Sequence, residues 1–406
     1  LILFKENSAM YRILKRLDGV VKVLHRYKII PAILARGDIY KLLRMRGIED
    51  FVSGIYANRK YQIKPLYRSI KGATTLHTAS IVGATTFWSN GYTGEGIRVC
   101  VIDTGIYSSH PELEGRVVSS KSFVLKEYGY SSDETDPDDV YGHGTMVAGI
   151  IAGAGIDQRG QGMAPDAYLM NARVFASDGT ITLAGVIAAI EWATLGPDST
   201  PDTGDEADII NLSLGSGEIY GSPTYLAIQN AIEEGIIVVC AAGNEGDTQI
   251  GSMSINDPAN SPYSIAVGAV SPDYDDVEYY TSIGPSLRLI VKPDIAAPSD
   301  VYVLSLNGGY TGPVAGTSFS SPHVAGSLAL VLDYLKSKGI PKQHWPAVSR
   351  ALIMHTASPL YVSSLEGLIR YEDLIIGAGL LNMTAAYLSL IHISEPTRPR
   401  LISYAV

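Results

Sequence analysis

Three side chains that could cooperate in nucleophilic catalysis stand in comparable settings along the 406-residue sequence. Asp103 ends an apolar run, His143 lies between two glycines before an apolar stretch, and Ser318 follows Gly-Thr at the start of another. A serine hydroxyl needs a neighbouring base before it can attack, imidazole is a suitable base, and a carboxylate fixes the imidazole tautomer. The pattern therefore predicts a site in which Ser318 is the nucleophile, His143 the base and Asp103 the orienting group.

Each of these residues also has an ordinary explanation. An aspartate at the end of a strand usually forms a turn or caps a helix, and a serine before a helix is usually a cap. A single histidine between glycines is more often a loop residue than a base. The joint pattern favours the catalytic interpretation, because all three are accompanied by glycines that allow the backbone to approach closely.

Asn244 could complete such a site. It follows an apolar run that ends at Cys240 and lies in the sequence Ala-Ala-Gly-Asn-Glu-Gly. Its side-chain amide could donate to the oxyanion of a tetrahedral intermediate, together with the backbone N–H of Ser318. The alternative is an asparagine that only shapes a turn.

The elements that position these residues follow an alternating pattern. Short, continuous apolar runs are typical of strands buried on both faces, and they occur at residues 96–102, 207–213 and 235–240. Stretches with helical periodicity occur at residues 145–154, 182–194, 223–234 and 320–336. This alternation predicts an α/β fold with a parallel sheet covered by helices on both sides. The reactive residues then lie at the carboxyl edge of that sheet.

Charge divides the chain into two parts. Residues 1–72 hold 16 Lys and Arg against 5 Asp and Glu, whereas the remainder holds 15 against 36. The basic segment is predicted to be a small α/β unit, with strands near residues 20–25 and 51–56 and a helix at 38–46. Charge alone leaves open two solvated surfaces, nucleic-acid binding, or docking of the basic part on the acidic part.

Composition excludes several classes of protein. With 46% hydrophobic residues the chain can form a sizeable core, so it is not globally disordered. No apolar run of about 18 residues is present, so no membrane-spanning helix is predicted. The two cysteines, Cys100 and Cys240, are too few for a disulfide framework and lack the spacing of zinc ligands. They are predicted to be buried free thiols.

Four segments together resemble the signatures of subtilisin-like serine proteases: residues 101–105, 142–149, 241–244, and 316–318 continued by 321–326. The order Asp, His, Ser along the chain is the order of that family. Further similarity at residues 211–215 and 351–357 extends the resemblance over about residues 95–388. It implies a three-layer α/β fold with a central, mostly parallel sheet.

The resemblance implies a serine endopeptidase that works through an acyl-enzyme, with Asp103, His143, Ser318 and Asn244 in the roles given above. Substrate is expected to lie extended along Ser213, Leu214 and Gly215, with broad specificity. No cofactor is needed for catalysis. Members of the family often bind structural calcium, but the acidic segments at 133–139 and 198–208 lack the spacing of a defined calcium loop. Each is expected to be a solvated acidic loop, and no metal ligand is assigned.

The resemblance also implies a role for the basic segment. Residues 1–72 are expected to be a propeptide that assists folding and inhibits the catalytic domain, residues 73–388, until it is cut away. Nucleic-acid binding is then disfavoured. Pro65 and several glycines mark residues 61–95 as a linker, and processing is expected between Tyr61 and Ser80. Secretion is expected, with the leader outside this chain, and residues 389–406 read as a non-native tail.

Two features depart from the family pattern or could mislead. Phe319-Ser320 replaces the usual Met-Ala after the nucleophile, and His323 matches a structural position rather than a catalytic one.

Two other functions remain open: an inactive homologue that only binds, and a different acyl-transfer enzyme such as an esterase. Labelling of Ser318 by a phosphonate would argue against the first. Comparison of matched peptide and ester substrates would address the second.

Overall fold

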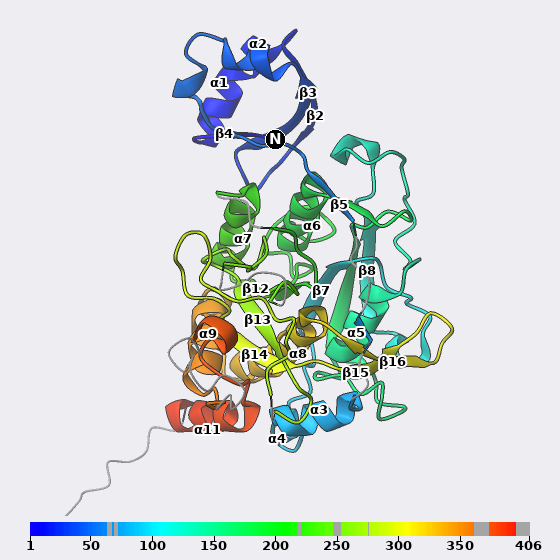
Figure 1. Ribbon diagram of the computed structural model, residues 1–406. Coiled ribbons are helices and arrows are strands. Elements are labelled where there is room, and N and C mark those ends of the chain that lie inside the picture. Colours follow the sequence, from blue (N-terminus) through cyan, green and yellow to red (C-terminus); the bar gives the residue numbers. More distant parts are fainter. Residues whose placement is uncertain are drawn as a thin grey trace, which may run out of the picture.

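A computed structural model describes residues 1–62, 67–68, 72–217, 221–246, 253–274, 276–360 and 373–394. Figure 1 shows two parts of unequal size, a small N-terminal unit (the head) and a larger body beneath it. The head comprises residues 1–56, and the body begins near residue 73.

The body is built on one sheet of seven parallel strands in the order β14-β13-β12-β11-β7-β9-β8. The strands are β7 (Arg98–Asp103), β8 (Val117–Ser122), β9 (Tyr168–Arg173), β11 (Ile209–Leu212), β12 (Ile237–Ala241), β13 (Ile265–Val270) and β14 (Ile295–Pro298). Apart from Arg98 at the start of β7, the residues of β7, β11, β12 and β13 are all buried, which explains the continuous apolar sequences.

Helices cover both faces of this sheet. One face carries α5 (His143–Ala152), α8 (Thr317–Ser337), α9 (Trp345–His355) and α11 (Met383–Ser394), and the other carries α6 (Leu183–Leu195) and α7 (Pro223–Glu233). Alternate residues of β7 show the division, because Val99 and Val101 pack with α5 and α8 while Cys100 and Ile102 pack with α6. The predicted three-layer α/β fold is confirmed.

Both cysteines are free and buried, as predicted. Cys100 lies in β7 and Cys240 in β12, where each fills the apolar layer against α6 and α7. Burial raises the pKa of the Cys240 thiol to about 12, and it raises the pKa of Cys100 further still. Both thiols are therefore packing groups.

The head is an antiparallel sheet with helices on one side. Its strands β1 (Ile2–Phe4), β2 (Val21–Arg26), β3 (Ala32–Gly37) and β4 (Val52–Ile55) have the order β2-β3-β1-β4. Its helices are α1 (Asn7–Leu17), α2 (Ile39–Leu43) and the 3-10 turn η1 (Ile48–Asp50). The sequence prediction missed α1, whose buried face is Ala9, Met10, Ile13 and Leu17.

The chain leaves the head through β5 (Lys60–Gln62), which pairs antiparallel with β10 (Thr180–Thr182) of the body. Further on, β6 (Tyr67–Arg68) pairs with β16 (Tyr310–Ala315), which in turn pairs with β15 (Val301–Leu304). The predicted linker is thus wrong in its first residues, since they add strands to the body.

The linker prediction also fails between residues 75 and 88. This segment forms α3 (Thr75–Val82) and α4 (Ala84–Trp88), with Ala79 and Phe87 fully buried in the body's core. Gly83 lies between the two helices with a φ of 87°, a conformation that glycine adopts without strain. Gly83, one of the glycines that suggested a linker, marks a helix end instead.

The remaining helical elements of the described body are short. They are the 3-10 turns η2 (Pro111–Leu113), η3 (Lys126–Tyr128) and η4 (Lys342–His344), and the short helix α10 (Asp373–Ile376). The expected start of a non-native tail at residue 389 falls inside α11, which continues to Ser394 with Leu390 buried. The rest of that predicted tail lies outside the described residues.

Candidate active site

The four predicted catalytic residues come together at the carboxyl edge of the sheet. Asp103 is the last residue of β7, His143 the first of α5, Ser318 lies in the first turn of α8, and Asn244 follows β12. His143, Asn244 and Ser318 line one cavity. Strand β7 lies between β11 and β9, where the order of strands diverges to both sides, and such a switch point is where open α/β sheets bind ligands.

Asp103 and His143 form a buried hydrogen-bonded pair. The Nδ1 atom of His143 lies 2.8 Å from Oδ1 of Asp103, which also accepts the backbone N–H of Thr104 at 2.7 Å. Burial lowers the pKa of His143, but the charge and hydrogen bond of Asp103 and the charge of Asp139 outweigh it, so the pKa is raised. With Nδ1 engaged by the carboxylate, Nε2 remains to exchange protons.

Asp139 fixes the start of α5, a role that the sequence analysis missed. Its Oδ1 accepts the backbone N–H of Gly142 at 2.7 Å and the hydroxyl of Thr104 at 2.9 Å, and its Oδ2 accepts the N–H of Thr145 at 3.0 Å. It is only 8% exposed, so the expectation of a solvated acidic loop is wrong at this position. The sequence signal for this role was a carboxylate four residues before a histidine that lies between two glycines.

Glycine is required where α5 approaches β7. A Cβ at Gly144 would lie 2.1 Å from the carbonyl oxygen of Gly105. Gly142 has a φ of 106°, which residues with a side chain rarely adopt. These glycines allow the histidine and the aspartate to approach within hydrogen-bonding distance.

Ser318 faces the same cavity from α8. In this structure its Oγ donates to the carbonyl oxygen of Ser213 at 3.1 Å, and the Oγ of Ser213 donates back to the carbonyl of Ser318 at 2.8 Å. The hydroxyl is thus held at the wall that contains Ser213, Leu214 and Gly215, all of which line the cavity. In proteases the bond from nucleophile to base often tightens only when substrate is bound.

The amide of Asn244 has a defined orientation. Its Oδ1 accepts both the backbone N–H and the hydroxyl of Thr317, each at 2.9 Å. Because both donors lie on the oxygen side, the NH₂ group is the part of the side chain left to donate elsewhere. The N-terminus of α8 adds its backbone N–H groups beside it.

Phe319, which departs from the family pattern, and His323, which matches it, both have clear places in the structure. Phe319 is fully buried, and its ring lies 5.6 Å from that of His143, centroid to centroid, so it packs directly against the base. His323 is buried between the carbonyl of Phe319 and the hydroxyl of Thr78, and burial lowers its pKa to about 4. The prediction that His323 is structural is confirmed.

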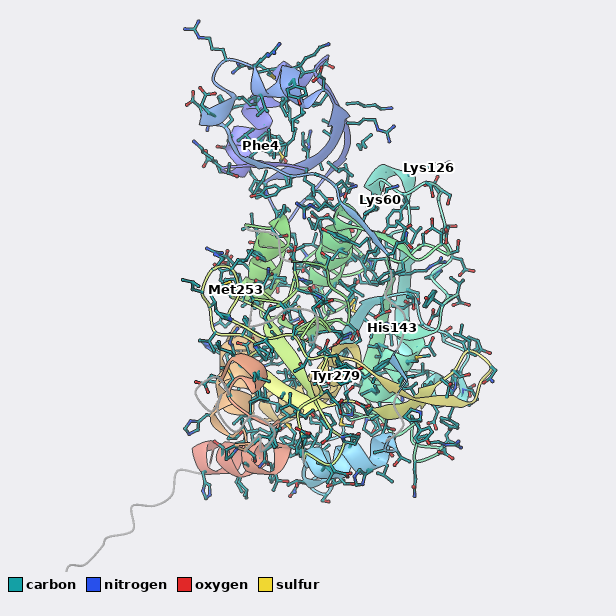
Figure 2. The ribbon with its side chains drawn as sticks, in the orientation of Figure 1. Phe4, Lys60, Lys126, His143, Met253 and Tyr279 are labelled. Atoms are coloured by element: carbon teal, nitrogen blue, oxygen red, sulfur yellow. The ribbon has the colours of Figure 1, made fainter. Side chains whose placement is uncertain are left out.

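Apolar side chains of the body also line the cavity, among them Ile181, Leu183, Val186 and Leu214. The strand that leaves the head contributes Tyr61 and Gln62 to the lining. Figure 2 shows His143 inside the body and Lys60 at the junction of head and body. Tyr61 and Gln62 were assigned to a linker, and no local signal in the sequence connects them with the site.

Several carboxylates of the two acidic segments are engaged by other groups of the protein. In the first, Glu134 pairs with Arg173 and Oδ1 of Asp136 accepts the N–H of Asp138. In the second, both carboxylate oxygens of Glu206 accept backbone N–H groups of its own loop. Within the described ranges no three His, Cys, Asp or Glu side chains are arranged to hold a metal ion.

Among the described helices, none is long and apolar enough to cross a membrane.

Comparison with known proteins gives a consistent result. Residues 94–379 match the family model described as the subtilase family, peptidase S8. The matched region contains all four residues discussed above, and it begins after α4.

Individual relatives include both subtilisins and intracellular proteases. The chain is 35% identical to serine protease AprX of Bacillus subtilis over 269 residues, which cover 59% of this chain and 58% of that protein. It is 38% identical to subtilisin E of the same species over 256 residues, 63% of this chain and 60% of that protein. An intracellular serine protease of Paenibacillus polymyxa is 30% identical over 342 residues, 80% of this chain and 97% of that protein. The chain thus spans less than two thirds of the length of the first two relatives.

Proposed function

This chain belongs to the subtilase family of serine proteases, and on that premise we propose that it is an endopeptidase that hydrolyses peptide bonds through an acyl-enzyme. The observation that carries the proposal is the buried Asp103–His143 pair beside a cavity that also holds Ser318 and Asn244.

In the proposed reaction, Nε2 of His143 takes the proton of the Ser318 hydroxyl as Oγ attacks the carbonyl carbon of the scissile bond. Asp103 holds the imidazole tautomer and stabilises the imidazolium. The imidazolium then protonates the leaving amine, and the same base activates the water that hydrolyses the acyl-enzyme. Since this base and nucleophile suffice for the reaction, catalysis is proposed to need no metal or other cofactor.

Asn244 is proposed to stabilise the tetrahedral intermediate. Its Oδ1 is engaged by Thr317, so its NH₂ group can donate to the oxyanion together with the backbone N–H of Ser318. Both donors are held before the charge develops, so little reorganisation is needed during the reaction.

A substrate is proposed to lie extended along Ser213, Leu214 and Gly215. Another strand that lines the cavity, β10, already pairs with β5 of the same chain, and Tyr61 and Gln62 of β5 line the cavity too. Recognition through main-chain hydrogen bonds depends little on side chains, which supports broad specificity. Protein and peptide substrates follow from this arrangement.

The head is proposed to be a propeptide that inhibits the body. Besides the β5–β10 pairing, Oε2 of the buried Glu191 accepts the backbone N–H groups of Lys28 and Ile29, the latter at 3.0 Å. The Tyr27 hydroxyl donates to the carbonyl of Ala184 at 3.1 Å. The head therefore docks on α6 and leads its connecting strand into the substrate cavity, as an inhibitor would.

Processing is proposed after the strand that enters the cavity, between Tyr61 and Ser80. Residues 63–66 and 69–71, which belong to this interval, lie outside the described residues, and so the bond that is cut is not assigned. Cutting would release the head as a separate chain that can still occupy the cavity.

Secretion is proposed from the presence of a propeptide-like head. Relatives named as intracellular serine proteases match the chain about as well as subtilisins do. The location is tested by separating the culture medium from the cells of the source organism and probing both with an antibody against the body.

The proposed activity is tested by producing the chain beside a Ser318→Ala variant and following both by denaturing gel and intact mass. The original chain is expected to lose about 60–80 N-terminal residues, take up a fluorophosphonate and then degrade casein, since its serine is activated by a base. The variant is expected to remain whole and unlabelled. If both stay whole, unlabelled and inert although folded, the endopeptidase proposal fails and the binding-protein alternative takes its place.

A further inference from the structure

The short segment from Tyr280 to Ser282 lies between the two turns that carry the proposed oxyanion donors. Tyr280 is 1% exposed and packs with Ala269 and Ala315 behind the nucleophile turn. It has no part in the reaction steps described above. Its hydroxyl is nevertheless the centre of a buried hydrogen-bond network.

On one side this network holds Gly316, two residues before Ser318. The N–H of Gly316 donates to the hydroxyl of Tyr280 at 3.0 Å and to Oγ of Ser299 at 3.0 Å, and the Ser299 hydroxyl donates to the Gly316 carbonyl at 3.1 Å. Gly316 has a φ of 142°, which residues with a side chain rarely adopt. Glycine adopts this conformation without strain, so the hydrogen bonds of its N–H and carbonyl are what hold the turn in place.

On the other side the same segment holds the turn of Asn244. The N–H of Ser282 donates to the carbonyl of Gly243 at 3.0 Å, and the N–H of Gly246 donates to the carbonyl of Tyr280 at 2.9 Å. The hydroxyl of Ser282 also lies 3.1 Å from Oε2 of Glu245. Both neighbours of Asn244 are thus tied to residues 280–282.

Asp300 anchors the hydroxyl of Tyr280 from behind. That hydroxyl lies 2.8 Å from Oγ of Ser299 and 3.2 Å from Oδ2 of Asp300, which is itself 4% exposed. Burial and the charge of Asp300 raise the pKa of Tyr280 well above its ordinary value, so the phenol keeps its proton. The protonated hydroxyl can donate its one hydrogen to Ser299 or to Asp300 while its oxygen accepts the N–H of Gly316.

We propose that Tyr280, supported by Ser299 and Asp300, is a positioning residue that fixes the spacing between the two oxyanion donors, the Asn244 amide and the Ser318 N–H. An oxyanion donor is effective only within about 2.7–3.1 Å of the developing charge, so a small shift of one turn relative to the other reduces catalysis. This inference rests on the proposed endopeptidase function.

The test compares Tyr280→Phe with Tyr279→Phe in the full chain. Tyr279 is the adjacent residue, has the same side chain and is 67% exposed, so its variant is a matched control. Active sites are counted with a fluorophosphonate. The kcat and KM are then measured on a peptide p-nitroanilide, together with the affinity for a peptide boronic acid, whose tetrahedral adduct uses the oxyanion donors.

Tyr280→Phe is expected to lower kcat about tenfold with KM within about twofold, and to weaken the boronic acid about tenfold, a fraction of the loss from deleting a donor outright. Tyr279→Phe is expected to change each value less than twofold. If kcat or boronic acid affinity per labelled site matches the control, the positioning role is refuted.

Ser299→Ala removes the hydroxyl of the other partner of the Gly316 N–H. It is expected to lower kcat and the affinity for the boronic acid by the same factors, and it tests the positioning role if the Tyr280 variant does not fold. An original chain that neither takes the phosphonate nor cleaves the substrate would overturn the proposed function, and the positioning role with it.

Discussion

The head and the body bury their sheets in different ways. In the body, both faces of the seven-stranded sheet are covered by helices of the body itself. In the head, Ile33 of β3 faces the core formed with α1, whereas Ala32 and Leu34 of the same strand pack into the body's cluster against α6 and α7. The second face of the head's sheet is therefore completed by another unit.

This difference indicates that the head depends on the body for part of its stability. A unit of this size buries a smaller fraction of its surface on folding than a large domain does. Tyr27 and Ile30, each almost fully buried, contribute to the shared cluster rather than to the head's own core. The body keeps its reactive residues at the edge of a sheet that needs no such partner. The proposed catalytic residues belong to the self-sufficient part, and the strand that follows the dependent part, β5, lines their cavity.

The contact between the two parts also refines the argument from charge. Opposite net charges favour encounter, but the docked contact is formed mainly by backbone groups and apolar side chains. Glu191 is bound by N–H groups, and its ion pair with His25 is long, at 4.0 Å. Net charge is therefore expected to affect the rate of docking more than the stability of the docked state.

Among substitutions that affect the body and the head differently, Asp103→Asn is expected to have the largest effect. The amide favours the wrong tautomer of His143, so kcat should fall about 10⁴-fold while the head docks as before. Losing the carboxylate also removes the charge that raises the pKa of His143, so the acid limb of the residual activity should move to lower pH. Steady-state kinetics against pH and a binding assay with isolated head would measure both. An unchanged acid limb would contradict the assignment.

A smaller effect on the body alone is expected from Asn244→Ala. Removing one oxyanion donor should lower kcat about 10²–10³-fold with little change in KM, the magnitude found when the equivalent donor is removed from a subtilisin. Thr317 would also lose its acceptor, so the free energy of unfolding should be measured beside the kinetics. A loss confined to KM would show that Asn244 binds substrate rather than the transition state.

The next effect concerns the contact between the parts. Glu191→Ala removes the acceptor of two head N–H groups, and a hydrogen bond to a charged group contributes about 1.5–3 kcal/mol, so the head should inhibit about 10- to 100-fold less tightly. Glu233→Ala on the neighbouring α7, where the side chain is exposed, is the control. Titration of processed enzyme with head measures the inhibition constant. Equal constants for the two variants would show that Glu191 does not hold the head.

The smallest effect is expected from pH acting on His25 in the head. Burial lowers the pKa of His25 in the docked state, and it is opposed by Glu127 and assisted by Lys121 and Lys28. A lowered pKa means that docking is fully stable above about pH 6.5, the ordinary value for histidine, and weakens as pH falls below it. The inhibition constant should therefore rise from pH 7.5 to 5.5.

His25→Phe is the comparison for this pH effect. It keeps a ring to pack against Tyr27 and Tyr128, which contact His25 edge to face, but it cannot bind a proton. Its inhibition constant should change less over the same range of pH. Parallel curves for the two proteins would exclude His25 as the source of the effect.

Much of the body could be predicted because its signals are local. Continuous apolar runs indicated β7, β11 and β12 within a residue or two, and helical periodicity indicated α6 and α8. The reactive residues stood beside glycines at the ends of these elements, so type and spacing identified Asp103, His143 and Ser318 as candidates before their contact was known. The head was harder, because the short α1 and the small strands carry weaker patterns.

The sequence by itself thus determined the family, the layer architecture of the body and the identity of the candidate catalytic residues. Only the tertiary structure decided that α3 and α4 belong to the core, that Tyr61 lies in the cavity, and that Glu191 receives the head. It alone joined Tyr280, Ser299 and Gly316 behind the nucleophile. Patterns along a chain report which side of an element is buried, whereas such contacts between distant residues depend on how the elements pack together.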